Sequence, residues 1–461
     1  MIAPTTSSVM PTVPGLPFLG SMLAYRRNRL ALWMRVRETC GDIGLVRLGN
    51  RSLMLISSPE LIHTVLVEQA DRFEKNPRFR HVMEPILGNG LVTSGNTFHK
   101  RQRKLVAPAF QHRQLASLVP LMAQAAEHLQ NQWQDGEVID LAPQMMQVTL
   151  QIVGKALFTA DLLGEAQELG KAITLAIRHT SAELMRMMPL PSPFSGFRQR
   201  RSQEAVKRLD QTVDRLITGR RTETSAPDDL LSLLLEARDQ DDGQGMTNQQ
   251  LRDEVMTLLQ AGRETTANAL SWAWYLLTHH PAAYTRLREE VDQALGQRLP
   301  GVQDLARLPY TLQVLKEALR LYPPVHFLGR VATQPVELGG YEVPTGSMVA
   351  ISPYVMHHRA DFFPDPMHFD PDHFRSEAEQ RLPRYAFLPF GGGPRICIGN
   401  HFAFMEGQLL LATLARAVTF ESLTESPMKP EPLITLRPKG RMRVRVHRRM
   451  NRDEQRGGNR A

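Results

Sequence analysis

The spacing of apolar residues along the chain predicts a protein built mainly from helices. Apolar positions recur every three or four residues, the period of one helix face, in six stretches of the N-terminal half. The predicted helices cover residues 59–69, 98–106, 114–134, 143–158, 163–188 and 196–220. Ahead of them, residues 42–57 have the alternation of two short strands that turn at Gly49 and Asn50.

The longest helix is predicted to begin at Thr247, because Thr247 and Gln250 have the spacing of a capping box. Nothing interrupts its apolar pattern before Pro281, so the helix would be about 50 Å long. A second well-marked helix, residues 309–321, ends shortly before a pair of prolines.

The C-terminal half is predicted to mix short strands with one more helix. Residues 331–351 and 442–446 alternate like strands, residues 357–374 are irregular, and residues 401–418 have a helical pattern. We find no internal repeat and no linker-like segment. The strands near both ends are therefore expected to form small sheets beside one helical body, and residues 1–461 to form a single domain.

The positive charge of the chain is concentrated at its C-terminal end. The net charge is +8, and residues 437–461 alone hold ten Lys or Arg against two Asp or Glu. The rest of the chain is about neutral, so nucleic-acid binding is not expected. We expect a basic, flexible tail over residues 447–461 and an irregular, proline-rich lead-in over residues 1–13.

The cysteine content limits the chemistry of the protein. Cys40 and Cys397 lie far apart, which excludes a disulfide framework and a multi-cysteine zinc site. The chain shows no export signal and no run of about 18 apolar residues, so we expect a cytoplasmic protein with no membrane span. Any essential cysteine would act alone.

The glycine-rich loop from Phe390 to Gly399 delivers Cys397 immediately before a predicted helix. A helix N-terminus carries partial positive charge and free N–H groups, which stabilise a thiolate and can bond its sulfur. Gly393 and Gly399 would let the backbone approach a flat macrocycle. The alternative is that Cys397 is a small buried apolar residue, which is the expected role of Cys40.

Polar residues interrupt the apolar turns of the long helix at Ala261-Gly262-Arg-Glu264-Thr265-Thr266. The Thr265 hydroxyl can bond the carbonyl of Ala261 and loosen the helix, which leaves room for a water or a diatomic ligand. Glu264 could then relay protons. The alternative is a solvated strip on an amphipathic helix.

Glu317 and Arg320 are three residues apart in the 309–321 helix, and therefore lie on one helix face. Taken alone, this spacing also fits an ordinary surface ion pair worth less than about 1 kcal/mol.

Together these patterns resemble the cytochromes P450. The loop matches the family's haem-ligand pattern Phe-x-x-Gly-x-Arg-x-Cys-x-Gly, and residues 261–266 match its oxygen-binding pattern Ala/Gly-Gly-x-Asp/Glu-Thr-Thr/Ser. The Glu317 and Arg320 pair occupies the family's place between them. The resemblance covers residues 14–445.

The resemblance implies a mostly α cytochrome P450 fold with a small β region, a single triangular domain that encloses haem b between the long helix and the cysteine loop. It makes Cys397 the fifth iron ligand, and gives Glu264 and Thr265 the delivery of protons to dioxygen, with Thr266 beside them. Residues expected against the haem are Ala261, Gly262, Phe390, Gly391, Arg395 and Gly399. Thiolate donation favours O–O cleavage, which leads to hydroxylation of an unactivated carbon.

Several basic residues are suited to the two haem propionates, because buried carboxylates require such partners. They are His99, Arg103, Arg330 and Arg395. His99 and Arg103 are four residues apart and resemble the His-x-x-x-Arg pattern of soluble bacterial members. A merely solvated basic helix is the alternative.

One position departs from the family pattern. The family's usual Pro-Glu-Arg-Phe is here Pro371-Asp-His373-Phe, so His373 replaces the arginine that completes the network of Glu317 and Arg320. The sequence therefore does not show which hydrogen bonds of this network support the cysteine loop.

An apolar substrate is expected, because the residues that should lie above the haem are mostly apolar. They are Val82, Met83, Ile86, Leu87, Leu91, Val92, Leu258, Val325, Phe327 and Leu328. His326 lies among them and could orient the substrate, unless its ring bonds neighbouring backbone. The overall pattern is similar to bacterial terpene and fatty-acid hydroxylases, and a steroid substrate also stays open.

Neither four spaced cysteines nor a Gly-x-Gly-x-x-Gly fingerprint occurs in this sequence, so no fused redox module is expected. The resemblance implies electrons from NAD(P)H through a separate ferredoxin and a flavin-dependent reductase, and the protein is expected to be a monomer. Two alternatives remain open: a haem-based sensor, and a peroxide-driven enzyme or isomerase. Glu264 and Thr265 argue against both, because neither needs proton delivery.

Overall fold

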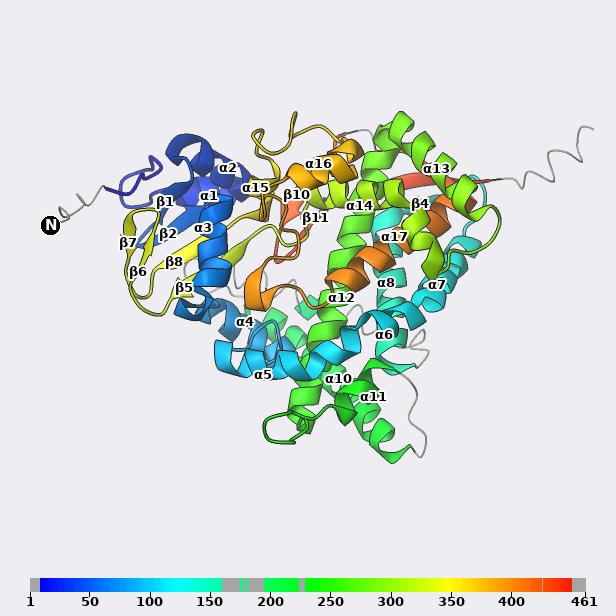
Figure 1. The fold of residues 1–461 in the computed structure, drawn as a ribbon, viewed down its shortest axis with the longest axis horizontal. Coiled ribbons are helices and arrows are strands. Elements are labelled where there is room, and N and C mark those ends of the chain that lie inside the picture. Colours follow the sequence, from blue (N-terminus) through cyan, green and yellow to red (C-terminus); the bar gives the residue numbers. More distant parts are fainter. Residues whose placement is uncertain are drawn as a thin grey trace, which may run out of the picture.

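The computed structural model describes residues 9–159, 175–176, 180, 195–223, 229–424 and 426–449, with the side chains of 195–199 and 201–202 left aside. The helix predicted at 163–188 therefore falls almost entirely outside the described residues. Figure 1 shows a mainly helical body with several short strands gathered on the side of the N-terminal elements and other strands set among the helices.

The helices have the following bounds: α1 Met22–Arg27, α2 Arg29–Cys40, α3 Pro59–His63, α4 Pro77–Leu87, α5 Asn96–Val106, α6 His112–Ser117, α7 Val119–Asn131, α8 Leu141–Phe158, α10 Ser195–Thr222, α11 Leu230–Glu236, α12 Asn248–His279, α13 Pro281–Leu295, α14 Pro309–Leu321, α15 Pro353–His357, α16 Ser376–Arg381 and α17 Asn400–Ala417. The strands are β1 Ile43–Leu48, β2 Arg51–Ile56, β3 Phe73–Glu74, β4 Val138–Asp140, β5 Leu328–Ala332, β6 Val336–Leu338, β7 Tyr341–Val343, β8 Met348–Ile351, β9 Val418–Ser422, β10 Lys429–Pro432, β11 Leu436–Lys439 and β12 Arg443–Arg448.

Helix α12 crosses the whole body of the protein (Figure 1). It begins with the predicted capping box, in which Thr247 and Gln250 bond each other's backbone N–H groups. Its middle is buried on most sides, and Trp272 and Trp274 are completely excluded from solvent. Gly262 lies so close to α8 that a Cβ there would be 2.7 Å from Val153. Helix packing thus accounts for this glycine, and the cofactor contact expected from the sequence stays a prediction.

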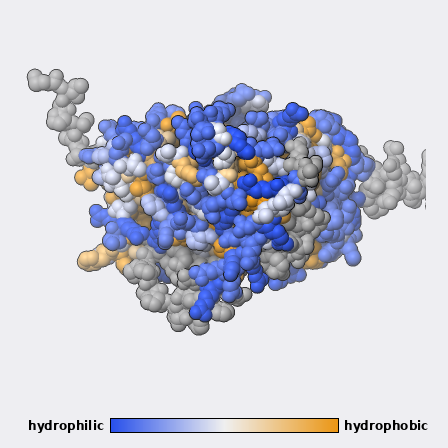
Figure 2. All heavy atoms as spheres, turned by 90° about the horizontal axis from the view of Figure 1, so that it is seen from below, coloured by the Kyte–Doolittle hydropathy of each residue, from blue (hydrophilic) through white to orange (hydrophobic). Residues whose placement is uncertain are grey.

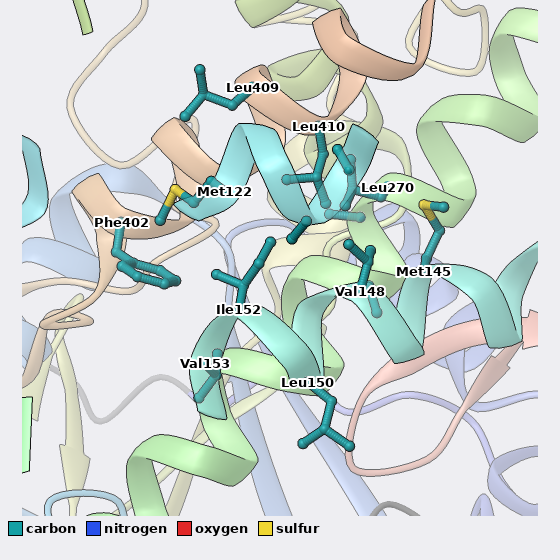
Figure 3. Packing of buried hydrophobic residues seen from close by; sticks show 14 of the residues in the cluster. Met122, Met145, Val148, Leu150, Ile152, Val153, Leu270, Phe402, Leu409 and Leu410 are labelled. Atoms are coloured by element: carbon teal, nitrogen blue, oxygen red, sulfur yellow. The ribbon is translucent and has the colours of Figure 1, made fainter. Parts of the chain in front are cut away.

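The core of the helical body forms where α7, α8, α12 and α17 meet (Figure 3). Apolar side chains from all four helices interlock there, among them Met122, Val148, Ile152, Leu270 and Leu410. Such a close-packed centre gives α12 and the start of α17 a rigid support.

Two sheets join strands from distant parts of the chain, as the sequence predicted. The larger sheet has the order β1-β2-β8-β5-β3, and β2 runs parallel to β8 with Leu53 opposite Met348. A second sheet has the order β4-β12-β9. The larger sheet thereby brings the N-terminal hairpin next to the segment that follows α14.

Prolines explain two differences from the predicted helices. The predicted helix 114–134 is divided at Leu118, because α7 starts anew with Pro120 in its first turn. Helix α4 was not predicted, and it contains Pro85 in its interior. Helices α1, α2, α11, α13, α15 and α16 were also missed.

The basic tail begins later than predicted. His447 and Arg448 belong to β12. Arg449 is also held, because it donates to the Ala415 carbonyl at 2.8 Å and to Asp292 at 2.6 Å. The expectation of a flexible tail from residue 447 is therefore wrong for residues 447–449, whose hydrogen bonds and strand pairing hold them to the body.

Candidate active site

Hydrogen bonds to backbone carbonyls hold the loop that presents Cys397 before α17. The Cys397 N–H donates to the carbonyl of Phe390 at 3.0 Å, and the Arg103 guanidinium donates to the carbonyl of Ile396 at 2.6 Å. Gly391 and Gly393 adopt positive φ angles of 71° and 67°, which favour glycine. The cysteine is thus presented by a shaped loop tied to α5.

The Cys397 side chain is accessible but surrounded by protein. Its surface is exposed, yet burial raises the pKa of the thiol above its ordinary value. The Gly399 N–H and the charge of Arg103 act in the opposite direction and favour the thiolate. Cys397 thus combines an exposed residue surface with a thiol whose ionisation is opposed by burial.

Gly393 and Gly399 have different surroundings in the loop. A Cβ on Gly393 would be 1.7 Å from the Leu66 carbonyl oxygen, so Gly393 is required for packing against the turn after α3. The expectation that it lets the backbone approach a macrocycle stays a prediction. A Cβ on Gly399 would be 3.8 Å from Phe110, an ordinary contact.

Basic side chains gather beside this loop. Burial is the main cause that lowers the pKa of His99 to about 3, and the charges of Arg395, Lys75 and Arg103 lower it further. Burial likewise lowers the pKa of Arg330 and that of Arg395 to about 10. Burial and three arginines hold the pKa of Lys75 well below its ordinary value. These groups repel one another in a desolvated space.

The cluster fits a buried dianion. The Arg395 guanidinium donates hydrogen bonds to the Asn96 side chain and to the carbonyl of Ser94. Its buried Nη1 has no partner among the described residues. Buried cations need paired acids. The two propionates of haem b would supply them, so the residues present fit this cofactor. The sequence did not predict Lys75 as part of this site, because a single lysine before a helix matches no motif for propionate binding.

Beside the basic cluster lies a cavity of about 440 Å³. Ala261 lines it and is exposed in the middle of α12, whereas Leu259 and Arg263, two residues before and after it, are buried. The other sequence-predicted residues in its wall are Met83, Leu87, Val92, Glu264, Thr265, Val325, His326, Phe327, Leu328 and Arg330. Most of these side chains are apolar, so the cavity suits an apolar molecule.

Four predicted substrate residues do not line this cavity. Ile86, Leu91 and Leu258 are buried in the hydrophobic core, and Val82 is half-buried elsewhere on α4. The face of α4 that lines the cavity carries residues 79, 83 and 87. Val82 and Ile86 point in other directions around the helix and therefore do not reach the cavity. Phe79 was missed, although its spacing from Met83 would have identified it once α4 was recognised.

A hydrogen-bonded group of side chains surrounds the acid of α12. Thr265 Oγ1 donates to the Ala261 carbonyl at 2.6 Å, the bond expected from the sequence. The buried Glu264 carboxylate accepts from Gln260 at 3.1 Å and from the Thr435 hydroxyl. Thr435 comes from the segment between β10 and β11 and also lines the cavity. It could not be found from the sequence, since only the fold brings it to α12.

Thr266 lies apart from this group. It is buried and does not belong to the cavity wall, and its hydroxyl lies against Glu406 of α17. Burial raises the pKa of Glu406 to about 8, and Thr266 only partly opposes this. Neither Glu406 oxygen meets hydrogen-bond geometry with a described residue, so the contact is loose. The expected catalytic role of Thr266 therefore has no support from its position.

Glu317 and Arg320 form a fully buried pair of two 2.7 Å hydrogen bonds, so the surface alternative is excluded. Arg320 also donates to the backbone carbonyls of His357, Pro366 and His368. His373 completes the network with its Nδ1 at 3.2 Å from a Glu317 oxygen. The histidine thus occupies the bracing position of the family's arginine.

The His326 side chain lines the cavity and is almost completely buried, with 3% of its surface exposed. Its Nδ1 has no partner among the described residues, so the ring does not bond neighbouring backbone through this atom. Burial lowers the pKa of His326 to about 3, and the ring is neutral.

This fold and site define a haem-thiolate enzyme, and comparison with known proteins agrees. The family model for cytochrome P450 matches residues 10–444, and the chain belongs to the cytochrome P450 family. Its structure superposes on the crystal structure of the cytochrome P450DA heme domain with a TM-score of 0.88 and 26% identity, covering 96% of this chain and 98% of the other.

Curated relatives are similar over nearly the whole chain. Cyclooctatin synthase from Streptomyces melanosporofaciens is 37% identical over 92% of both chains. Cyclooctat-9-en-7-ol 5-monooxygenase from the same organism is 34% identical over 90% of this chain and 92% of the relative. Pentalenene oxygenase from Streptomyces avermitilis is 33% identical over 94% and 96%. The chain is thus a haem-iron monooxygenase, which inserts oxygen from O2 into an apolar substrate. None of the described helices has both the length and the apolar content to span a membrane.

Proposed function

We propose that this cytochrome P450 hydroxylates a cyclic terpenoid. The observation that carries the proposal is the apolar cavity that ends at Ala261, Glu264 and Thr265. Relatives whose names specify cyclooctat-9-en-7-ol and pentalenene favour this class over a fatty acid or a steroid.

In this proposal Cys397 ligates the haem iron, and His99, Arg330, Arg395 and Lys75 bind the propionates. When bound, the haem supplies the oxygen-activating chemistry of the reaction. The Gly399 N–H and the charge of Arg103 favour the thiolate form of the Cys397 sulfur and oppose the burial that raises the pKa of this thiol. The apolar wall excludes water and holds a substrate carbon near Ala261.

Protons are held and moved by residues of α12 and its neighbour Thr435. Glu264 receives hydrogen bonds from Gln260 and Thr435, which orient its carboxylate at the cavity wall. Thr265 bonds the Ala261 carbonyl and can hold a water beside it. Glu264 passes a proton to that water, and the Thr265 hydroxyl sets the water's position.

Electrons come, in this proposal, from NAD(P)H through a ferredoxin and a flavin-dependent reductase. The support is the resemblance to soluble bacterial members of the family. We also propose that the protein acts as a monomeric single domain in the cytoplasm.

Two measurements test the proposal. Spectral titration of the holoenzyme against terpenes, fatty acids and steroids should give the tightest binding for a cyclic terpene or terpene alcohol. Tighter binding of a linear fatty acid would overturn the substrate class. Single turnover with O2 and two supplied electrons should yield a hydroxylated terpenoid, whereas binding with no product would indicate a sensor.

A further inference from the structure

Exposed apolar side chains are concentrated at the N-terminal end of the described chain. Among the described residues, five of the eight large apolar side chains with high exposure lie between residues 9 and 23. They are Val9, Leu16, Phe18, Leu19 and Leu23, with exposed fractions from 45% to 98%. Such clustering marks an interaction surface rather than scattered surface residues.

The centre of this cluster is a rigid turn. Leu16 and Gly20 exchange two backbone hydrogen bonds of 2.8 and 2.9 Å, so residues 17–19 form a closed tip. Phe18 at the tip has a φ of 58° and is 98% exposed. A bulky residue in the left-handed region is strained, and an exposed phenyl ring is poorly solvated. Packing within the protein explains neither the strained backbone of Phe18 nor the exposure of its ring.

The tip is held firmly against the β1–β2 hairpin. The Ser21 N–H donates to the Arg47 carbonyl at 2.7 Å, and the Gly49 N–H donates to the Leu19 carbonyl at 3.1 Å. A Cβ on Gly20 would be 2.2 Å from the Arg47 carbonyl oxygen, so the turn is in close contact with β1. The apolar tip is therefore a fixed projection.

The charge around the tip is strongly positive. Residues 9–52 contain seven arginines and two acids, and one of these acids, Asp42, is paired with Arg37 and Arg359. Arg26, Arg27 and Arg35 are exposed and follow the apolar side chains closely along the chain, and no acid occurs between residues 9 and 37. Figure 2 shows orange apolar residues at the left edge of the molecule, among mostly blue hydrophilic ones.

The active-site cavity reaches the same elements. Its wall includes Tyr25 and Arg29 from α1 and α2, and Leu48, Arg51 and Ser52 from the hairpin, and Arg51 and Ser52 are exposed. The cavity thus extends from Ala261 to the elements that hold the apolar tip.

We propose that this N-terminal surface, formed by Val9, Leu16, Phe18, Leu19, Leu23, Arg26 and Arg27, docks the enzyme on an anionic lipid membrane. The apolar tip inserts at the headgroup boundary and the arginines bind lipid phosphates. An apolar substrate dissolved in the bilayer then reaches the cavity with little passage through water. A projecting tip suits a deformable bilayer, whereas a protein partner would require a broad complementary face of about 800 Å².

The test is sedimentation of the haem-loaded enzyme with vesicles, followed by its Soret absorbance. The wild type should pellet with vesicles of equal phosphatidylcholine and phosphatidylglycerol, and much less with phosphatidylcholine alone or at high salt. Phe18→Asp should reduce the bound fraction about tenfold. Met367→Asp is the matched control, since Met367 is an exposed apolar residue outside the surface, with 66% exposure.

Leu23→Asp provides a second variant on α1, and the CO-difference spectrum of each variant checks its fold. Wild-type protein that stays in the supernatant with anionic vesicles would overturn the proposal, as would Phe18→Asp that pellets like the wild type. If the wild type does not bind vesicles but forms a dimer that Phe18→Asp disrupts, the membrane proposal is wrong and the surface binds a second copy of the chain. None of these outcomes depends on the identity of the substrate.

Discussion

His373 Nδ1 lies 3.2 Å from a carboxylate oxygen of Glu317, while its Nε2 lies 2.9 Å from the Pro364 carbonyl oxygen. Both ring nitrogens therefore face acceptors, an arrangement that favours the doubly protonated imidazolium. Burial lowers the pKa of His373, but the hydrogen bond and charge of Glu317 outweigh it and raise the pKa overall. The histidine thereby acts as a cation, as the family's arginine would.

We predict that the stabilising contribution of His373 depends on pH. Because its folded pKa is raised, the contribution is fully present below the ordinary value of 6.5 and is lost as pH rises through the folded pKa. At about pH 5.5, His373→Ala should lower the free energy of unfolding by about 2 kcal/mol. Urea unfolding of the wild type and the variant over a pH series measures this difference.

His373→Arg is the control, because arginine stays charged at every pH used. It should keep the stabilisation at pH values above the folded pKa of His373, where the histidine loses it. A difference between the wild type and His373→Ala that does not change with pH would show that His373 is held as a neutral ring.

Local patterns were enough to predict the parts of the site that lie within one segment. The capping box of α12, the bounds of α14 and the loop that presents Cys397 depend on neighbours in sequence, and so could be predicted. The cavity wall depends on distant segments. Lys75 and Thr435 reach it only through the packing of β3 and of the β10–β11 segment, which no local pattern records.

Steric contacts explain several errors. Gly393 matches the family's loop, but only the position of the Leu66 carbonyl shows why a glycine is needed there. Pro85 obscured α4, and with it the cavity face that carries Phe79 and Met83. Thr266 shares a motif with Thr265 but points elsewhere, because adjacent helix residues differ by about 100°.

The two threonines of α12 should differ in function. In the proposed mechanism, Thr265→Ala leaves haem binding and substrate affinity nearly unchanged but lowers product per NAD(P)H at least about tenfold, with the difference appearing as peroxide. The reason is that the hydroxyl at the cavity wall is lost, and protons reach the wrong oxygen atom.

Thr266→Ala should retain coupling, because Thr266 lies against Glu406 away from the cavity. Product and peroxide are measured per NAD(P)H for both variants. Normal coupling in Thr265→Ala together with uncoupling in Thr266→Ala would show that the proton-delivery role belongs to the other residue.

We predict that His326 orients the substrate. Its neutral ring lies in the cavity wall with Nδ1 unpartnered, so a polar atom of the substrate can pair with it. His326→Ala should weaken the binding of a terpene alcohol about tenfold, the value of one hydrogen bond, and should change the product distribution. Binding of the corresponding hydrocarbon should change less.

Phe327→Leu serves as the comparison, since it alters the same wall without removing a polar group. Binding spectra and products are compared for the alcohol and the hydrocarbon. If His326→Ala binds both ligands and yields the same products as the wild type, His326 has only a structural role.

The central claim is that Cys397 ligates the haem iron as a thiolate, and the CO-difference spectrum of the reduced enzyme tests it most directly. The wild type should show the red-shifted Soret band typical of thiolate ligation. Cys397→Ser should keep its helical content and lose this band, because a neutral hydroxyl is a poor donor to iron. Cys40→Ser is the control and should keep the band, since Cys40 packs beside β1 against Gly44. An unchanged spectrum in Cys397→Ser would contradict the assignment of the ligand.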